Sequence, residues 1–388
     1  MTCSSPVTMT GPKTMTFPQT MIWTTMMTHD PFHDKDISTL RTTDSALTLP
    51  SGRSIVLPKT FGFCRGVRNA VNLLHQTILE NEGRQIWLLG AMIHNPAVNE
   101  QFAQRGVRII AESDLETAFD TAPADDVFVV PAFGLPFDFE RRLRAFVMPP
   151  GKIVDTTCPF VRRVWQAVSQ AAAAGAAVII HGQPGHQETT AIWSRAAAEA
   201  AAVAIIPNPD LARQFAAAAG TNDLYASYPA ELLFNHKRLA DTAWTVVNQT
   251  TMLGTDTTAI ADILRTAAWH QAPLQIADTL CVATQSRQGA AKALCKRPCD
   301  VIFVLGGTNS SNTTQLYRLA AEHADAFFLQ SPDDLQASMV RHFNPATATW
   351  EETKDWLTSS CQTIGVLAGA SCPDSELGNL IRKIASLA

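Results

Sequence analysis

Three cysteines in the sequence follow similar apolar segments and precede stretches with helical periodicity. They are Cys64 in FGFCRGVRNAV, Cys158 in VDTTCPFVRRV and Cys281 in ADTLCVATQSR. A thiol at a helix N-terminus lies near the positive end of the helix dipole, which favours the thiolate. Pro159 suits a first helical position, because proline lacks the N–H that is unpaired there. One such cysteine alone is more often a small buried apolar residue, but three at matched positions are candidate metal ligands.

A polar loop follows each of these cysteines after 28 to 30 residues, at the end of an apolar segment. The loops are GAMIHNP with His94, GQPGHQE with His186 and Glu188, and GGTNSSN with Ser310, Ser311 and Asn312. A second apolar segment and loop then follow in each case: VFVV before PAFGLP, TVV before NQTTM, and IGVL before AGASCP. This repetition predicts three related modules, each contributing one cysteine and two polar loops to a common centre.

The modules are expected to have an α/β fold with mainly parallel sheets. Short apolar runs alternate with alanine-rich helical stretches from Ser54 onward, which is typical of βα units. The expected strands are Ile86–Leu89, Val127–Val130, Ala177–Ile180, Thr245–Val247, Val301–Leu305 and Ile364–Leu367. Ligands bind at the carboxyl ends of strands in open α/β sheets, so the loops after these strands are the expected site.

The domain boundaries follow from the repeat. We expect α/β modules over residues 55–150, 151–270 and 271–388, related by a pseudo-threefold axis. The extra sequence between Ala197 and Thr245 is expected to form a surface insertion of the second module. Residues 1–54 are rich in Thr and Met and lack apolar periodicity, so we expect a disordered extension there.

The composition is that of a soluble globular protein. The 388 residues are 46% hydrophobic and 17% charged, with a net charge of -5. This mild acidity gives no reason to expect nucleic acid or an anionic membrane as a partner. No apolar run approaches the roughly 20 residues that span a bilayer, and no signal-type segment opens the chain. A cytoplasmic location is therefore expected, where the eight scattered cysteines favour free thiols, metal ligation or catalysis.

Three converging thiols could hold either of two metal groups. A structural zinc site with three thiolates normally recruits a fourth ligand and uses close CxxC pairs, which this chain lacks. A 4Fe-4S cluster commonly takes four thiolates, so three would leave one iron with an open position. Open positions are where metals do chemistry. The CKRPC pair, Cys295 and Cys299, lies outside the repeat and is interpreted as structural.

The polar loops indicate an anionic substrate. Hydroxyl, amide and backbone groups of GGTNSSN can donate to phosphate oxygens, and Ser371 in AGAS adds another hydroxyl. Glu188 is the only carboxylate in the six loops. Beside a metal site and the hydroxyls of Thr250 and Thr251, it is a candidate proton donor. The alternative is that Glu188 caps the helix that follows it.

Eight sequence blocks, in order, resemble one enzyme family. They are GFCRGVRNAV, IHNPAVNEQFAQRGV, DTTCPFV, GHQE, NQTT, ATQSRQ, GGTNSSNTTQL and AGASCPD. From roughly Pro58 to the C-terminus the chain is similar to the 4-hydroxy-3-methylbut-2-enyl diphosphate reductases, the LytB or IspH family. The resemblance implies an oxidoreductase of non-mevalonate isoprene biosynthesis with a 4Fe-4S cluster held by three cysteines. Its open iron would bind the allylic alcohol, and reduction would give isopentenyl and dimethylallyl diphosphates.

The resemblance also implies roles for individual residues. Cys64, Cys158 and Cys281 would hold the cluster, and Glu188 with Thr251 would relay the proton, with Thr250 beside them. The diphosphate would be bound by His94, His186, Ser310, Ser311, Asn312 and Ser371. The chain contains neither GxGxxG nor a P-loop, so electrons are expected from an external carrier such as a ferredoxin or flavodoxin.

The sequence departs from the family pattern at three places. Phe133 stands where the family has the histidine of Ala-His-Gly, GHQETTA replaces GHPEVEG, and Trp165 replaces a frequent histidine. The loss of a charge-assisted hydrogen-bond donor at Phe133 lowers the expected affinity for the diphosphate. Two alternatives to the isoprenoid reductase therefore remain: a paralogue acting on a substrate with a different tail, and a non-catalytic iron-sulfur sensor. Glu188 and Thr251 argue against the sensor, because a sensor needs no proton donor.

Overall fold

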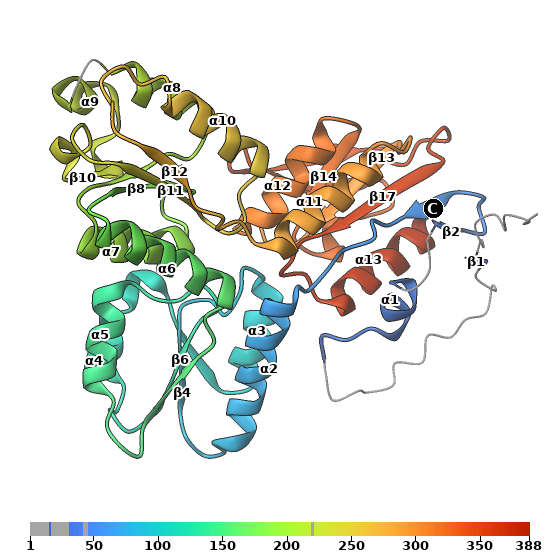
Figure 1. Ribbon diagram of the computed structural model, residues 1–388. Helices are drawn as coiled ribbons and strands as arrows, with labels where there is room; N and C mark the ends of the chain where they lie inside the picture. Colours follow the sequence, from blue (N-terminus) through green and yellow to red (C-terminus); the bar gives the residue numbers. More distant parts are fainter. Residues whose placement is uncertain (1–14, 17–30, 42–45, 219–220) are drawn as a thin grey trace, which may run out of the picture. The chain divides into compact units, whose positions relative to one another are not determined.

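A computed structural model describes residues 15–16, 31–41, 46–218 and 221–388 of the protein (Figure 1). Two compact units account for the fold. The terminal unit comprises Met1–Gly62, Gly289–Gly306 and Leu316–Ala388, and the central unit comprises Phe63–Gln288 and Gly307–Gln315. No helix among the described residues is long and apolar enough to cross a membrane.

The central unit begins with a parallel four-stranded sheet. Its strand order is β5-β4-β6-β7, with β4 at Ile86–Leu89, β5 at Val107–Ile110, β6 at Val127–Val130 and β7 at Lys152–Asp155. The accompanying helices are α2 (Arg65–Glu80), α3 (Pro96–Gln104), α4 (Thr117–Thr121) and α5 (Phe137–Phe146). Every residue of β4 and β6 is buried, which explains why both strands read as unbroken apolar runs.

A second sheet of five strands completes the central unit. Its order is β10-β9-β8-β11-β12, with β8 at Ala177–His181, β9 at Val203–Ile205, β10 at Leu233–Phe234, β11 at Trp244–Asn248 and β12 at Leu274–Ile276. Only β10 runs antiparallel to its neighbour. The helices are α6 (Pro159–Ala173), α7 (Gln187–Glu199), α8 (Pro209–Ala217), α9 (Thr221–Ser227) and α10 (Gly254–Leu264).

The prediction of a surface insertion between Ala197 and Thr245 is wrong for the main part of this segment. This stretch supplies β9, which is fully buried and pairs with β8 inside the sheet. Its aromatic side chain Phe215 is buried against Trp244 of β11, with ring centroids 5.5 Å apart. The segment therefore belongs to the core of the second sheet. Because its composition is rich in alanine, the short strand was not recognisable from the sequence.

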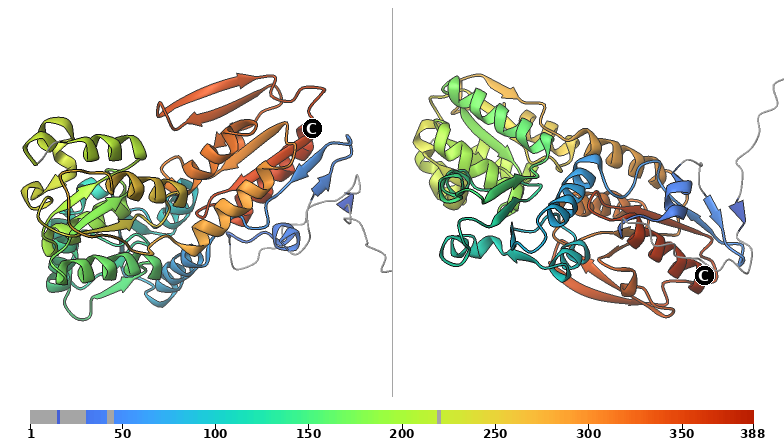
Figure 2. Two further views of the ribbon diagram at one scale, coloured as in Figure 1. Left: turned by 45° about the horizontal axis from the view of Figure 1, so that its top comes forward. Right: turned by 90° about the horizontal axis from the view of Figure 1, so that it is seen from below.

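The terminal unit is built on a third sheet with the order β1-β2-β3-β17-β13-β14. Its strands are β1 (Met15–Thr16), β2 (Ala46–Thr48), β3 (Ser54–Val56), β13 (Val301–Leu305), β14 (Asp325–Leu329) and β17 (Thr363–Ala368). Its helices are α1 (Lys35–Leu40) and α13 (Asp374–Leu387), with the later residues of α11 (Val282–Cys295) and α12 (Ser311–Ala321), whose first turns belong to the central unit. A hairpin of β15 (Met339–Asn344) and β16 (Thr349–Lys354) forms its own two-stranded sheet (Figure 2).

Four short 3-10 helices lie in the connections, at Glu112–Asp114, Ala230–Leu232, His236–Arg238 and Pro332–Asp334. All six strands expected from the sequence are present, three of them with the expected bounds. The expectation of an α/β chain with mainly parallel sheets is thus confirmed.

The N-terminal region differs from the disordered extension expected over residues 1–54. Within its described part, Asp34 caps α1 by accepting from the backbone N–H groups of Asp36 and Ile37. Arg41 forms an ion pair with Asp374 of α13, and β2 pairs with β3. Residues 1–14, 17–30 and 42–45 lie outside the described residues, so for them the expectation stays a prediction.

The observed strand pairs do not follow the expected module boundaries. β3 pairs with β17 and so belongs to the third sheet, although it overlaps the expected start of the first module. β7 joins the first sheet beyond residue 150, and β12 joins the second beyond residue 270. These partners are distant in sequence or cross a module boundary, which a linear repeat cannot reveal.

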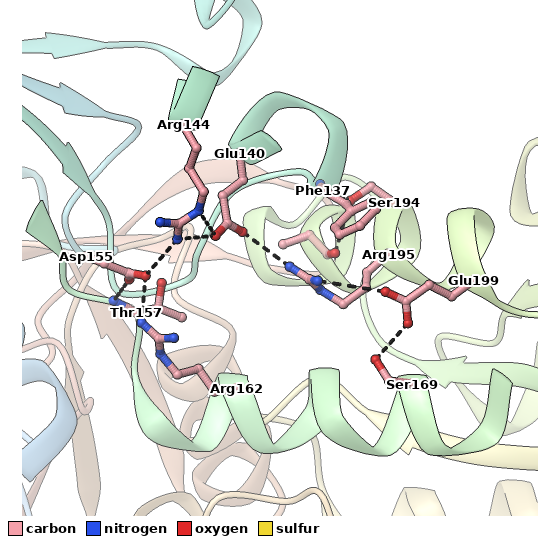
Figure 3. A network of polar contacts seen from close by, with 11 residues as sticks. Phe137, Glu140, Arg144, Asp155, Thr157, Arg162, Ser169, Ser194, Arg195 and Glu199 are labelled. Carbon is pink, nitrogen blue, oxygen red and sulfur yellow. Dashed lines mark hydrogen bonds and ion pairs between the residues drawn. The ribbon is translucent and has the colours of Figure 1, made fainter. Parts of the chain in front are cut away.

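An ion-pair network joins the two α/β modules of the central unit (Figure 3). Arg195 of α7 contacts Glu140 of α5 at 3.2 Å, and these side chains are only 13% and 15% exposed. On the same face, Arg162 of α6 contacts Asp155 of β7 at 2.6 Å. The Arg195–Glu140 pair is poorly exposed and is therefore weakly screened by salt. The network therefore fixes the orientation of α6 and α7, the two helices that begin at the candidate site.

Candidate active site

Each of the three cysteines of the repeat lies at the start of a helix. Cys64 is the N-cap of α2, and its Sγ accepts from the backbone N–H of Val67 at 3.3 Å. Cys158 is the N-cap of α6, with a proline at the first helical position as expected. Cys281 directly precedes α11, and backbone N–H groups of that first turn also donate to its thiol. The predicted helix N-terminal setting is confirmed for all three.

The three thiols lie close together within the central unit. A Cβ atom added at Gly66 would be 2.7 Å from Cys158 Sγ and 3.8 Å from Cys64 Sγ. The charge of Cys158 interacts with those of both Cys64 and Cys281, and the charge of Cys281 interacts with that of Cys64. Glycine at position 66 thus leaves room for the sulfur atoms, a feature that the sequence analysis did not single out.

The protonation of these thiols depends on what they bind. Burial raises the pKa of Cys158 to about 11 and also raises the pKa of Cys281, while backbone N–H groups at the helix starts oppose the shift. Burial thus favours the protonated forms of Cys158 and Cys281. A metal group would displace those protons, because metal ligands must be deprotonated.

The donor set fits an iron-sulfur group. Soft thiolates are its usual ligands, and the chain supplies three free thiols, each at the positive end of a helix. Within the described ranges, no three His, Cys, Asp or Glu side chains gather closely enough to hold a single metal ion.

Replacing Gly66 with alanine is expected to reduce loading of the metal group severalfold. The new methyl would overlap Cys158 Sγ, so the thiol or the first turn of α2 must shift. Iron content per chain after anaerobic reconstitution measures the effect. Gly289→Ala in α11 is the matched control, because a Cβ there meets nothing within 4 Å. Equal iron content in the two variants would show that the gap at Gly66 is not needed.

Glu188 is fully enclosed beside the thiols. Its carboxylate accepts from the backbone N–H of Thr250 at 2.7 Å and from the Thr250 hydroxyl at 3.0 Å. Burial raises the pKa of Glu188 to about 7, against the two hydrogen bonds from Thr250, which lower it. The backbone N–H of Cys281 donates to the Thr250 carbonyl at 3.1 Å. One threonine thus connects the carboxyl group to a cysteine of the candidate metal site.

The alternative role of Glu188 as a helix cap does not match this geometry. The N-cap of α7 is His186, whose Nδ1 accepts from the backbone N–H of Glu188 at 3.1 Å. The Glu188 carboxylate instead points to the loop after β11, where it accepts from both the backbone N–H and the hydroxyl of Thr250. Thr251 lies next to it, and its hydroxyl accepts from the Gln249 amide at 3.0 Å. The participation of Thr251 in a relay stays a prediction.

The two histidines of the expected diphosphate site are neighbours. The His94 and His186 rings meet edge to face, with centroids 4.6 Å apart. Phe133 stacks on His94 with centroids 4.2 Å apart. Burial lowers the pKa of His94 to about 4 and lowers that of His186 well below its ordinary value. Both rings are therefore neutral at pH 7 in the absence of an anion.

The loop after β13 approaches the same histidines. A Cβ added at Gly307 would overlap the carbonyl of His94, so this close approach requires glycine. Ser310, Ser311 and Asn312 are buried, and the hydroxyl of Ser311 lies 4.0 Å from the sulfur of Met252, next to Thr251. These predicted substrate residues therefore share the central unit with Glu188 and the cysteines. Ser371 is buried in the terminal unit, after β17, and its place in the site stays a prediction.

The departures from the family pattern are physically linked. Gly134, which follows Phe133, has a positive φ of 80°, and a Cβ there would overlap the Trp165 ring. Arg195 stacks on the same ring, with its guanidinium carbon 4.3 Å from the ring centroid. The indole therefore fills the space behind the loop of Phe133.

The chain is similar to known proteins over most of its length. The chain matches the family described as LytB protein over residues 55–385. It is 33% identical to a 4-hydroxy-3-methylbut-2-enyl diphosphate reductase from Gloeobacter violaceus, over 87% of this chain and 83% of that protein. A reductase of the same name from Parasynechococcus marenigrum is 32% identical, over 90% and 89%.

Two solved structures share the fold. One is the E-1-hydroxy-2-methyl-but-2-enyl-4-diphosphate reductase from Plasmodium falciparum, with a TM-score of 0.65, 20% identity, and coverage of 85% of this chain and 87% of that one. The other is an (E)-4-hydroxy-3-methyl-but-2-enyl diphosphate reductase, with a TM-score of 0.53, 23% identity, and coverage of 86% and 99%. Together with the match over residues 55–385, these likenesses show that the chain belongs to the LytB family.

Proposed function

We propose that the protein is an oxidoreductase that removes the allylic hydroxyl of 4-hydroxy-3-methylbut-2-enyl diphosphate. The products would be isopentenyl and dimethylallyl diphosphates, the end of non-mevalonate isoprene biosynthesis. The observation that carries the proposal is a protonatable carboxyl group, Glu188, whose partner Thr250 also accepts from the backbone N–H of Cys281, one of the three neighbouring cysteines. The names of the relatives supply the substrate.

The family identity implies an iron-sulfur cluster, and we assign it as 4Fe-4S with Cys64, Cys158 and Cys281 as ligands. Such a group would supply single electrons and one iron without a thiolate, open to the substrate alcohol. The protein's part is to keep the three sulfurs gathered at helix N-termini, where the N–H groups favour their negative charge.

Glu188 is assigned as the proton donor to the leaving hydroxyl. Overall the C–O bond breaks, two electrons and two protons are consumed, and one water leaves. One proton goes to the hydroxyl oxygen, and the other goes to either end of the allyl unit, which gives two isomeric products. A carboxyl group with a pKa of about 7 can both hold a proton at neutral pH and release it. Thr251 and Thr250 are proposed to complete the relay.

The diphosphate is proposed to bind to His94, His186, Ser310, Ser311, Asn312 and Ser371. Without an anion the two imidazoles are neutral, so each can donate one N–H without carrying charge into a buried region. Bound diphosphate would raise their pKa values, because a nearby negative charge favours the protonated ring. Phe133 provides an apolar ring in this corner and no donor.

Electrons are proposed to come from an external carrier such as a ferredoxin or flavodoxin. The sequence contains no nucleotide-binding fingerprint that would allow direct use of NAD(P)H. The seven described cysteines are free thiols, which suits a reducing cytoplasm.

An anaerobic assay of the reconstituted protein tests the proposal. The allylic diphosphate and a chemical reductant are supplied, products are identified by mass spectrometry, and Phe133→His is compared with the unchanged protein. We expect turnover by both, with tighter substrate binding in the variant because it regains a donor. An iron-loaded protein that converts nothing, with or without the histidine, would reject this substrate and favour the paralogue or sensor.

A further inference from the structure

Gln187 occupies a central place in the candidate site without a role in the scheme above. It is the first residue of α7, between His186 and Glu188, and only 5% of its surface is exposed. Its side chain is an amide, placed between an imidazole and a carboxyl group. A buried amide carries two N–H donors and one oxygen acceptor. In native proteins such groups are normally paired.

The amide of Gln187 completes no hydrogen bond of normal geometry to any described residue. Both its nitrogen and its oxygen are buried and unsatisfied. An amide left in this state destabilises the fold, so a partner is expected when the protein is at work. A ligand bound at this place would provide that partner.

The direction of the side chain shows where the ligand would lie. The Gln187 nitrogen lies so close to Gly90 that a Cβ at this glycine would overlap it. Gly90 directly follows β4 and is the first residue of the loop that carries His94. The Gln187 side chain also faces His94 and, as a loose hydrogen-bond partner, raises the pKa of that ring against the stronger effect of burial, although neither amide atom makes a hydrogen bond of normal length and angle. The amide of α7 thus reaches across to the histidine loop of the neighbouring module.

Two aromatic rings pack against His94. Phe133 covers one face of the ring at 4.2 Å, and the His186 ring stands at its edge at 4.6 Å. Phe133 and His186 are themselves 5.8 Å apart, so the three rings form one cluster. The cluster offers two neutral imidazoles and an apolar ring, and Gln187 adds an unpaired amide beside it.

We propose that Gln187 is a further substrate-binding residue, whose amide N–H donates to a diphosphate oxygen beside His94. This inference rests on the proposed function and extends it. Gln187 would supply a neutral hydrogen-bond donor beside His94, where the Phe133 ring supplies none.

The test measures binding of inorganic diphosphate to the iron-loaded protein by calorimetry, so that it does not depend on turnover. Gln187→Met keeps the length of the side chain and removes both the amide N–H donors and the amide oxygen acceptor. We expect its dissociation constant to rise about tenfold, the effect of one lost neutral hydrogen bond. With the allylic diphosphate, KM should rise by a similar factor while kcat changes less than about twofold. Gln104→Met, on the exposed side of α3, is the matched control and should change neither quantity.

Two further variants exclude a merely structural role. Gln187→Asn keeps an amide but withdraws it by one methylene, and it should weaken binding in the same direction. Adding Phe133→His to Gln187→Met should restore most of the lost affinity, because the histidine offers a donor in the same corner. Iron content and unfolding temperature are measured on every variant. Unchanged diphosphate affinity in a folded Gln187→Met or Gln187→Asn protein overturns the proposal.

Failure of this inference is distinguishable from failure of the proposed function. If the unchanged protein binds diphosphate through Gln187 but does not reduce the allylic alcohol, the inference holds and the reaction is wrong. If it reduces the alcohol and the Gln187 variants bind diphosphate normally, the reaction stands and the inference is overturned. A protein that does not bind diphosphate at all rejects both.

Discussion

Glu188→Gln is expected to lower kcat by about 10² to 10⁴-fold, the usual contribution of a positioned proton donor. The amide keeps the size of the side chain and can still bond to Thr250, so the fold and the metal group should be unaffected. It cannot release a proton to the departing hydroxyl. Anaerobic turnover, normalised to iron content, measures the loss.

The pH dependence gives this prediction a second readout. Burial raises the pKa of Glu188 to about 7, so its protonated fraction falls as the pH rises through that value. Turnover in the unchanged protein should therefore decline above about pH 7, and the residual rate of Glu188→Gln should lack this decline. Glu199→Gln, at the other end of α7, is the control and should keep both rate and profile. A Glu188→Gln protein with an unaffected rate would remove Glu188 from the mechanism.

Cys158→Ala is expected to abolish both the metal group and the activity. Cys158 lies close to the other two thiols and shares space with Gly66. Without it, two thiolates would remain, which is too few for the expected cluster. Visible absorbance, iron and sulfide per chain, and turnover should all fall to background.

The control for this change is Cys299→Ala in the terminal unit. Cys299 is half-buried and packs near Gly365 of β17. It should load iron and turn over substrate normally. Retention of full iron and sulfide content by Cys158→Ala would mean that this thiol is not a ligand.

Local pattern was enough to predict the strands and the positions of the cysteines. The runs Ile86–Leu89, Val127–Val130 and Val301–Leu305 are buried on both faces, so their apolar letters alone mark β4, β6 and β13. Each cysteine also stands at a boundary between an apolar lead-in and an amphipathic segment. Such boundaries are visible without any knowledge of tertiary structure.

Elements that depend on distant partners were not predictable in this way. β9 has three residues within an alanine-rich stretch, and it is recognisable as a strand only through its pairing with β8. β3 belongs to the third sheet because it pairs with β17, about 300 residues away in the chain. The folded state of α1 likewise depends on contacts of Asp34 and Arg41 with α13.

The same division applies to the candidate site. Residue type and spacing pointed to Glu188 and the two histidines. The partner of Glu188 is Thr250, and the low pKa values of His94 and His186 arise from burial by side chains of several loops. Gln187 appeared in the sequence only as a departure from a motif. Its unpaired amide becomes evident when the neighbouring module is present.

Mössbauer spectroscopy of protein reconstituted with iron-57, with and without the allylic diphosphate, tests the central claim most directly. The account predicts a 4Fe-4S cluster in which three irons have thiolate ligands and one is distinct, and the signal of that one should change when the substrate binds. Four equivalent irons whose signals do not change when the substrate is added would contradict the claim that Cys64, Cys158 and Cys281 leave one iron open for the alcohol. The absence of any cluster would contradict it as well.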